Sequence, residues 1–181
     1  MSADLHLHAA LPACPMAEDL FAALRSMDID VLPWPAADDC AGALLIAPEL
    51  GREPAANDWP AVAAALTAAF AAIQTFVARR SGRPAHVVAL VPAMAAMGDP
   101  QDPTGSALAG AMLSLFRTLA LELKKVGTTT NTLLVGRAGE QLHGAADIAG
   151  LIRSLIVQTH ATITGQEIFA CSGLDTGRLR P

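Results

Sequence analysis

Tyrosine is missing from the 181 residues of this chain, and aromatic residues of all kinds make up only 4% of it. A chain without tyrosine cannot use a phenol as a proton donor or acceptor. Basic residues are few as well, with 12 Lys and Arg against 17 Asp and Glu, and they form no cluster or stripe. This distribution argues against nucleic-acid binding, which needs a concentrated positive surface.

Only three cysteines are present, and Cys14, Cys40 and Cys171 lie far apart in the sequence. They form no CxxC pair, and an odd number argues against a disulfide framework. The first residues also lack the basic stretch and the apolar core of a secretory signal. We therefore expect a reduced, cytoplasmic protein.

Apolar residues make up 52% of the chain and charged residues 16%. This composition provides ample material for a core and excludes disorder. The length fits one domain over residues 1–181. The stretch 59–78 is long and uncharged enough for a membrane span. Because it is mostly alanine and carries three polar side chains, we expect a soluble helix and no membrane partner.

Short apolar runs alternate with helical stretches along the chain, and no internal repeat is visible. This alternation predicts an α/β fold with a parallel sheet. Asp58 is a suitable N-cap for a helix, with Pro60 just inside it. The predicted strands are 5–10, 30–32, 43–47, 87–91, 129–135 and 167–170, and the predicted helices are 17–26, 58–80, 106–125 and 145–158.

The two long predicted helices have unusual surfaces. A surface helix normally has one apolar stripe and one polar face, whereas 58–80 is apolar almost all round and 106–125 has few polar breaks. One side of each helix can cover the sheet, and a second subunit is the natural partner for the other side. The alternative is that alanine simply tolerates exposure. The predicted interface residues are Leu66, Phe70, Ile73, Val77, Ala107, Ala111, Leu115 and Leu119.

Five phrases of the sequence occur in the order and at the spacing of one known family. Residues 106–123 read SALAGAMLSLFRTLALEL, 130–136 read TNTLLVG, 146–149 read ADIA, and 163–168 read ITGQEI. A helix entered by Asp58 and Trp59 completes the set. From about residue 43 to 179 the chain therefore resembles the short-chain dehydrogenase/reductase family. The resemblance implies a truncated Rossmann-like, doubly wound parallel sheet with helices on both faces.

The resemblance also implies where catalytic side chains should be. Members of this family use a Tyr, a Lys, a Ser and an Asn that converge on the substrate and pass a proton. The matching positions in this chain are, in that order, Gly105, Ala109, Pro92 and Leu66. None of these side chains has a proton to transfer, and without tyrosine no shifted alignment restores the first. We therefore expect a pseudoenzyme, a chain that is not an enzyme.

The nucleotide-binding half of the family pattern is altered too. Members begin with a strand, a glycine-rich turn and a helix whose N-terminus receives the pyrophosphate. The equivalent stretch 5–24 contains no glycine and places Pro12 and Pro15 where backbone N–H donors are needed. We expect residues 1–50 to be a degenerate nucleotide-binding half that holds no cofactor. Residues 51–181 would be a retained oligomerisation half.

A few other residues could carry chemistry. His6 and His8 share one face of the first predicted strand, but no third ligand completes a metal site. Cys14 lies near a helix start, where a thiolate would be stabilised, although a buried thiol is the simpler interpretation. Ser106 has no base at a known spacing and is interpreted as a helix N-cap. The remaining histidines are predicted at the surface: His86, His143 and His160.

The resemblance and the apolar helices together predict a non-catalytic subunit. It would assemble through helices 58–80 and 106–125 with a catalytically intact paralogue of the family, as a heterodimer or heterotetramer. The analogy adds that the partner would act on a 3-hydroxyacyl or 3-oxoacyl thioester. Two alternatives stay open. One is a homo-oligomeric binding module that uses the former substrate cleft, and the other is a divergent oxidoreductase with a relocated active site.

Overall fold

The computed structural model of the chain describes residues 5–35, 41–48, 58–80, 83–138, 141–142, 144–158 and 162–171. Three residues named above, Cys40, His143 and His160, lie outside these ranges. The strands of the main sheet are β1 (Leu5–Ala10), β2 (Ile29–Pro33), β3 (Ala43–Ile46), β4 (Ala85–Pro92), β5 (Thr128–Val135) and β8 (Glu167–Ala170). The helices are α1 (Pro15–Arg25), α2 (Trp59–Arg80), α3 (Ala93–Ala96), α4 (Pro103–Leu123) and α5 (Ala145–Ile156).

All six strands of the main sheet run parallel, in the order β2-β1-β3-β4-β5-β8. The register places Leu7 of β1 opposite Val31 of β2 and Ala43 of β3. Strands β3 and β5 are buried along their whole length, as expected when both faces of a parallel sheet are covered. The predicted α/β class, with a doubly wound parallel sheet, is confirmed.

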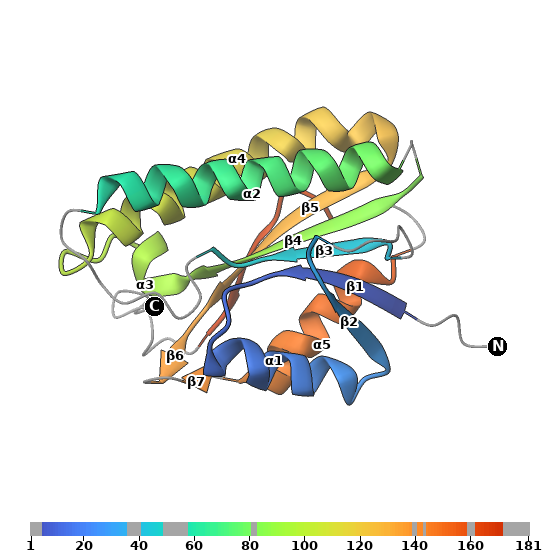
Figure 1. The fold of residues 1–181 in the computed structure, drawn as a ribbon, viewed down its shortest axis with the longest axis horizontal. Helices are drawn as coiled ribbons and strands as arrows, with labels where there is room; N and C mark the ends of the chain where they lie inside the picture. The colour runs from blue at the N-terminus through green and yellow to red at the C-terminus, as the bar shows by residue number, and fades with distance from the viewer. Residues whose placement is uncertain are drawn as a thin grey trace.

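Helices cover both faces of the sheet, with α2 and α4 on one side and α1 and α5 on the other (Figure 1). Each face has its own core, because successive side chains of a strand point to opposite faces. On β3, Leu45 packs with the residues of α1 and α5, whereas Leu44 packs with those of α2 and α4. On the second face α2 packs over β3 and β4, and α4 packs over β4 and β5.

The starts of the two long helices, α2 and α4, are explained by side-chain caps. The Asp58 carboxylate accepts a hydrogen bond from the Ala61 N–H at 3.2 Å, as predicted for α2. At α4 the cap is Asp102, whose Oδ1 accepts from the Gly105 N–H at 2.9 Å. The helix therefore begins three residues before the predicted Ser106, since Pro103 fits the first turn.

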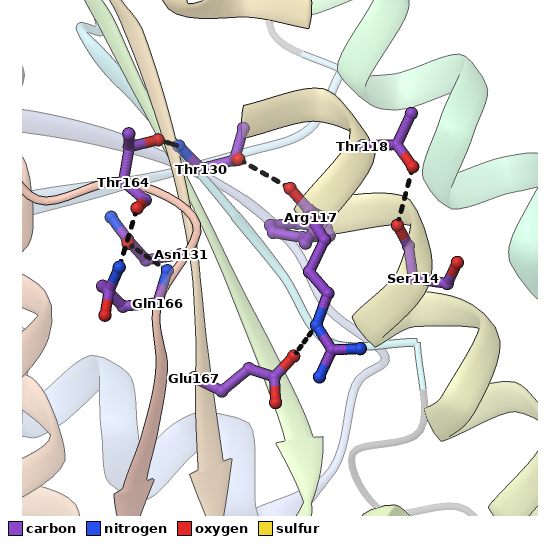
Figure 2. A network of polar contacts seen from close by, with 9 residues as sticks. Ser114, Arg117, Thr118, Thr130, Asn131, Thr164, Gln166 and Glu167 are labelled. Carbon is purple, nitrogen blue, oxygen red and sulfur yellow. Dashed lines mark hydrogen bonds and ion pairs between the residues drawn. The ribbon is translucent and has the colours of Figure 1, made fainter. Parts of the chain in front are cut away.

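A network of polar contacts attaches β8 to the rest of the sheet (Figure 2). The Asn131 side chain donates to the Ile163 carbonyl at 2.9 Å and accepts from the Gln166 N–H at 3.1 Å. The Thr130 hydroxyl donates to the Phe116 carbonyl of α4 at 3.0 Å. These bonds satisfy the buried polar side chains of β5, which an apolar pattern alone would not place in a core.

Three short elements were not predicted. They are the helix α3 and the two strands of an antiparallel pair, β6 (Arg137–Ala138) and β7 (Gln141–Leu142). Elements of two to four residues are too short to show a period in the sequence.

Two helices of the described chain, 59–80 and 103–126, are long and apolar enough to cross a membrane by length and composition. In the structure both lie side by side on one face of the sheet (Figure 1). A core helix of a soluble protein passes the same test, but only 22% and 33% of the two apolar windows are buried, so packing on the sheet covers only part of each helix.

Candidate functional site

The strand order changes direction between β1 and β3. From β1 the chain passes through α1 to β2 on one side, and it then continues in β3 on the other side of β1. In open parallel sheets, ligands bind outside the carboxyl ends of the strands at such a switch point. The edge next to Ala10 and Ile46, which end β1 and β3, is therefore the candidate functional site.

A groove of about 560 Å³ lies at this edge. Backbone bonds hold the neighbours of the β1 end in place, since the Trp34 N–H donates to the Ala9 carbonyl at 3.1 Å and the Ala47 N–H to the Ala10 carbonyl at 3.4 Å. One wall follows the strands and contains Ala10, Pro12, Trp34, Pro35, Ile46 and Pro48, and the other belongs to α2 and contains Ala65, Ala68, Ala69, Ala71, Ala72 and Thr75.

Trp34 joins the groove to a cluster of aromatic rings. The ring centroid of His8 lies 5.5 Å from that of Trp34 and 6.4 Å from that of Phe76, in edge-to-face arrangements. The Arg79 guanidinium lies 5.3 Å from the Trp34 centroid, a cation–π distance. His8 is buried, and His6 is partly exposed with its Nδ1 at 3.3 Å from Asp30. The two histidines thus have separate packing roles.

The turn after β1 does not fit a dinucleotide. Helix α1 begins at Pro15, which has no N–H to offer. The N–H groups of Ala17 and Glu18 already point to the Cys14 carbonyl, at 3.0 and 3.2 Å. Glu18 adds a negative charge to the first turn, where a pyrophosphate requires a positive one. No reaction step can therefore be derived through a dinucleotide held by this turn.

The four positions matched to the family's catalytic side chains lie on three different elements. Pro92 ends β4 and precedes α3, while Gly105 and Ala109 are buried at the start of α4. Leu66 lies on α2 and lines a shallow groove on the outer surface, together with Ala111 of α4. None of the four offers a group that could hold or move a proton at the carboxyl edge.

The interpretation of Ser106 as a helix N-cap is wrong. Its hydroxyl accepts from the Asp99 N–H at 2.8 Å and donates to the Asp99 carbonyl at 3.3 Å, while Asp102 caps α4. The serine closes the turn before the helix, and both hydroxyl functions are used there. No sequence signal distinguishes this turn from an N-cap, because serine is common in both.

The prediction that His86 lies at the surface is also wrong. Its side chain is buried in β4, and its Nδ1 lies 2.8 Å from the Thr129 hydroxyl of β5. Burial lowers the pKa of His86 below its ordinary 6.5, and the nearby Arg80 charge lowers it further, against an opposing hydrogen bond with the Gln158 backbone. The histidine therefore favours the neutral form. It lies near the amino end of its strand, opposite the candidate site.

The predicted interface residues fall mainly on the outer surface of α2 and α4. Leu66, Phe70, Ala111 and Leu115 line a groove of about 300 Å³ there. Ile73 is a correction, because it faces the sheet and is only 1% exposed. By spacing alone Ile73 shares a helical stripe with Leu66 and Phe70, but its side chain packs in the core between the helices and the sheet. The rest of the predicted set is half-buried: Val77, Ala107 and Leu119.

No protein-family model and no curated protein matches this sequence. Solved structures do. An acetoin dehydrogenase from Enterobacter cloacae is 13% identical over 98% of this chain and 99% of its own, with a TM-score of 0.76. An enoyl-[acyl-carrier-protein] reductase (NADH) from Aquifex aeolicus is 12% identical over 96% and 97%, with a TM-score of 0.73. A third is an NADPH-bound short-chain oxidoreductase with an atypical catalytic centre, from Pseudomonas aeruginosa, 19% identical over 95% and 87%, with a TM-score of 0.66.

These neighbours contradict the prediction that the chain is not an enzyme. They are dehydrogenases and reductases, and the likeness of fold extends along nearly the whole of both chains. The prediction was wrong because it treated the replacement of four catalytic side chains as the absence of any catalytic activity. Missing groups at Gly105, Ala109, Pro92 and Leu66 exclude one proton-transfer arrangement and leave others open.

Proposed function

We propose that this chain, which has the fold of the short-chain dehydrogenases/reductases, works as an oxidoreductase together with a second chain of the same fold. The observation that carries the proposal is the full-length likeness to dehydrogenases and reductases. The activities of these neighbours supply the reaction class: an alcohol is oxidised to a carbonyl, or an enoyl unit is reduced to a saturated one, and NAD(P)+ or NAD(P)H takes up or supplies the two electrons. Small hydroxyketones and acyl thioesters are the proposed substrates.

The outer surface of α2 and α4 supports the assembly. The groove between Leu66, Phe70, Ala111 and Leu115 is apolar apart from Thr67, and Phe70 is 40% exposed. Exposed apolar patches of this kind mark interaction surfaces. We propose that the second chain, a catalytically intact paralogue, packs its own pair of helices on this surface.

The second chain would also bind the electron carrier. Because the turn before α1 in this chain does not fit a pyrophosphate, we assign the dinucleotide to the partner. Among the described residues that follow the strands at the carboxyl edge, Cys14 and Cys171 carry thiols. They are the first side chains to replace in a search for the groups that move protons here.

The test is co-expression with an intact member of the fold family encoded near this chain. We expect the two chains to co-purify, and the pair to oxidise acetoin or a 3-hydroxybutyryl thioester faster than the partner alone, measured as NAD(P)H absorbance. Ala111→Glu should abolish both the complex and the gain in rate, because it places a charge in the outer groove. The proposal would be refuted if the two chains did not co-purify, or if the pair turned over either substrate no faster than the partner alone.

A further inference from the structure

The groove at the carboxyl edge exists because the helix layer does not extend over the whole sheet. On this face α2 covers β3 and β4, and α4 covers β4 and β5. Strands β1 and β2 continue beyond the flank of α2, and Trp34 stands at the end of β2 facing that flank. The space between them is the groove of about 560 Å³, a size at which pockets enclose small ligands.

The described walls of the groove offer no charged group to a ligand. Of the described residues that line the groove, all are Ala, Pro or Ile except Trp34 and Thr75. Neither of these two carries a charge. A phosphate placed here would lose its hydration without a cation in contact, at a cost of several kcal/mol. An apolar ligand instead gains about 25 cal/mol for each Å² of apolar surface removed from water.

The neighbouring helix start excludes the usual anion anchor. Pro15 lacks an N–H, and the N–H groups of Ala17 and Glu18 are directed to the Cys14 carbonyl. The Glu18 carboxylate repels anions from the same turn. The switch point therefore retains a ligand-sized hollow but has lost the polar groups that would hold a nucleotide in it.

We propose that this groove binds an uncharged, apolar small molecule at the position where an edge of this type would hold a nucleotide. The ligand lies between the Trp34 ring and the small side chains of α2, chiefly Ala68 and Ala72. The indole supplies a flat apolar wall whose orientation is fixed by Phe76 and Arg79. Thr75 can offer one hydroxyl to a ligand alcohol or ketone. This inference does not depend on the proposed oxidoreductase activity or on a second chain.

The test is calorimetric titration of the full chain with cyclohexanol, benzyl alcohol and octan-1-ol, and separately with NADH, AMP and inorganic pyrophosphate. We expect the apolar probes to bind with a negative heat-capacity change, which marks burial of apolar surface. We expect no heat from the phosphate compounds. No binding by the three apolar probes, or binding of NADH, AMP or pyrophosphate that a groove variant removes, would overturn the proposal.

A matched pair of variants places the binding in the groove. Ala68 lines it and is exposed, so Ala68→Trp should fill the space without straining the core and should weaken probe binding by more than about tenfold. Ala64 is exposed on the same helix outside both grooves, so Ala64→Trp should leave binding unchanged. Equal effects of the two variants would show non-specific partitioning and overturn the proposal. Ala72→Leu provides a second filling variant if Ala68→Trp does not fold.

Discussion

Replacing Asn131 by alanine tests whether the polar network, rather than apolar packing, holds β8 on the sheet. The Asn131 side chain is 1% exposed and makes two bonds to the segment before β8, to the Ile163 carbonyl and the Gln166 N–H. Asn131→Ala leaves both backbone groups without these partners. A buried group left unsatisfied costs about 1–3 kcal/mol. Because Ile163 and Gln166 are themselves exposed, water can reach them, and the lower end applies to each.

The expected loss for Asn131→Ala is therefore about 2 kcal/mol in the free energy of unfolding. Urea unfolding followed by circular dichroism measures it. Hydrogen exchange should also show faster exchange of the Gly165 and Thr132 amides, whose bonds of 2.7 Å to Thr130 and 2.8 Å to Gln166 belong to the same junction.

Thr118→Ala is the matched control. Its hydroxyl bonds to the Ser114 carbonyl at 3.0 Å on an exposed turn of α4, so its loss should change stability by less than about 0.5 kcal/mol. If Asn131→Ala is no more destabilising than Thr118→Ala, the network contributes nothing measurable and the reasoning is refuted. Asn131→Asp adds a second check. It keeps the acceptor for Gln166 and sets a carboxylate against the Ile163 carbonyl, so its stability should improve as the pH falls.

Three further outcomes are expected. Stability should fall as the pH drops from about 6.5 through the lowered pKa of His86, because the unfolded state then binds a proton that the folded state does not; His86→Gln should remove this part of the slope in pH-dependent urea unfolding. Gly165→Ala should cost about 1–2 kcal/mol, because Gly165 has φ +71° and its added Cβ would lie 3.2 Å from the Ala120 Cβ; Gly110→Ala, with open space around it, should not destabilise the helix. Ala111→Glu should dissociate the complex with the second chain in analytical ultracentrifugation, whereas Ser154→Glu on the exposed surface of α5 should not, and equal effects would remove the outer groove from the interface.

The sequence was sufficient for the order and type of the long elements. The predicted bounds of strands such as β1 and β8 match the structure at both ends. Turn residues bound their apolar runs, and strands and helices alternate regularly along the chain. The start of α4 was missed because two aspartates and a serine, Asp99, Asp102 and Ser106, all suit a cap. Only the hydrogen bonds decide among them.

The candidate site was harder to predict. The absence of a glycine-rich turn was visible in the sequence. In the structure, the Ala17 and Glu18 N–H groups of this turn donate to the Cys14 carbonyl. The groove could not be predicted from the sequence. No sequence pattern indicates that Trp34, which follows β2, faces the alanines of α2 across an open space. Burial of His86 was missed for a related reason, since its partner Thr129 lies 43 residues away.

The apolar surface of α2 illustrates why sequence patterns misjudge such sites. From the sequence we predicted that α2 buries two apolar sides, one against the sheet and one against a partner subunit. The structure shows three sides: Ile73 and Phe76 face the sheet, Leu66 and Phe70 face the outer groove, and Ala68 and Ala72 face the groove at the carboxyl edge. Since the two grooves lie on different sides of one helix, their functions should separate. Ala68→Trp should block the apolar probes and leave the assembly with the second chain unchanged, and Ala111→Glu should prevent the assembly and leave probe binding unchanged. If either variant abolished both probe binding and assembly while keeping the helical circular dichroism signal, the assignment of two independent surfaces to α2 would be wrong.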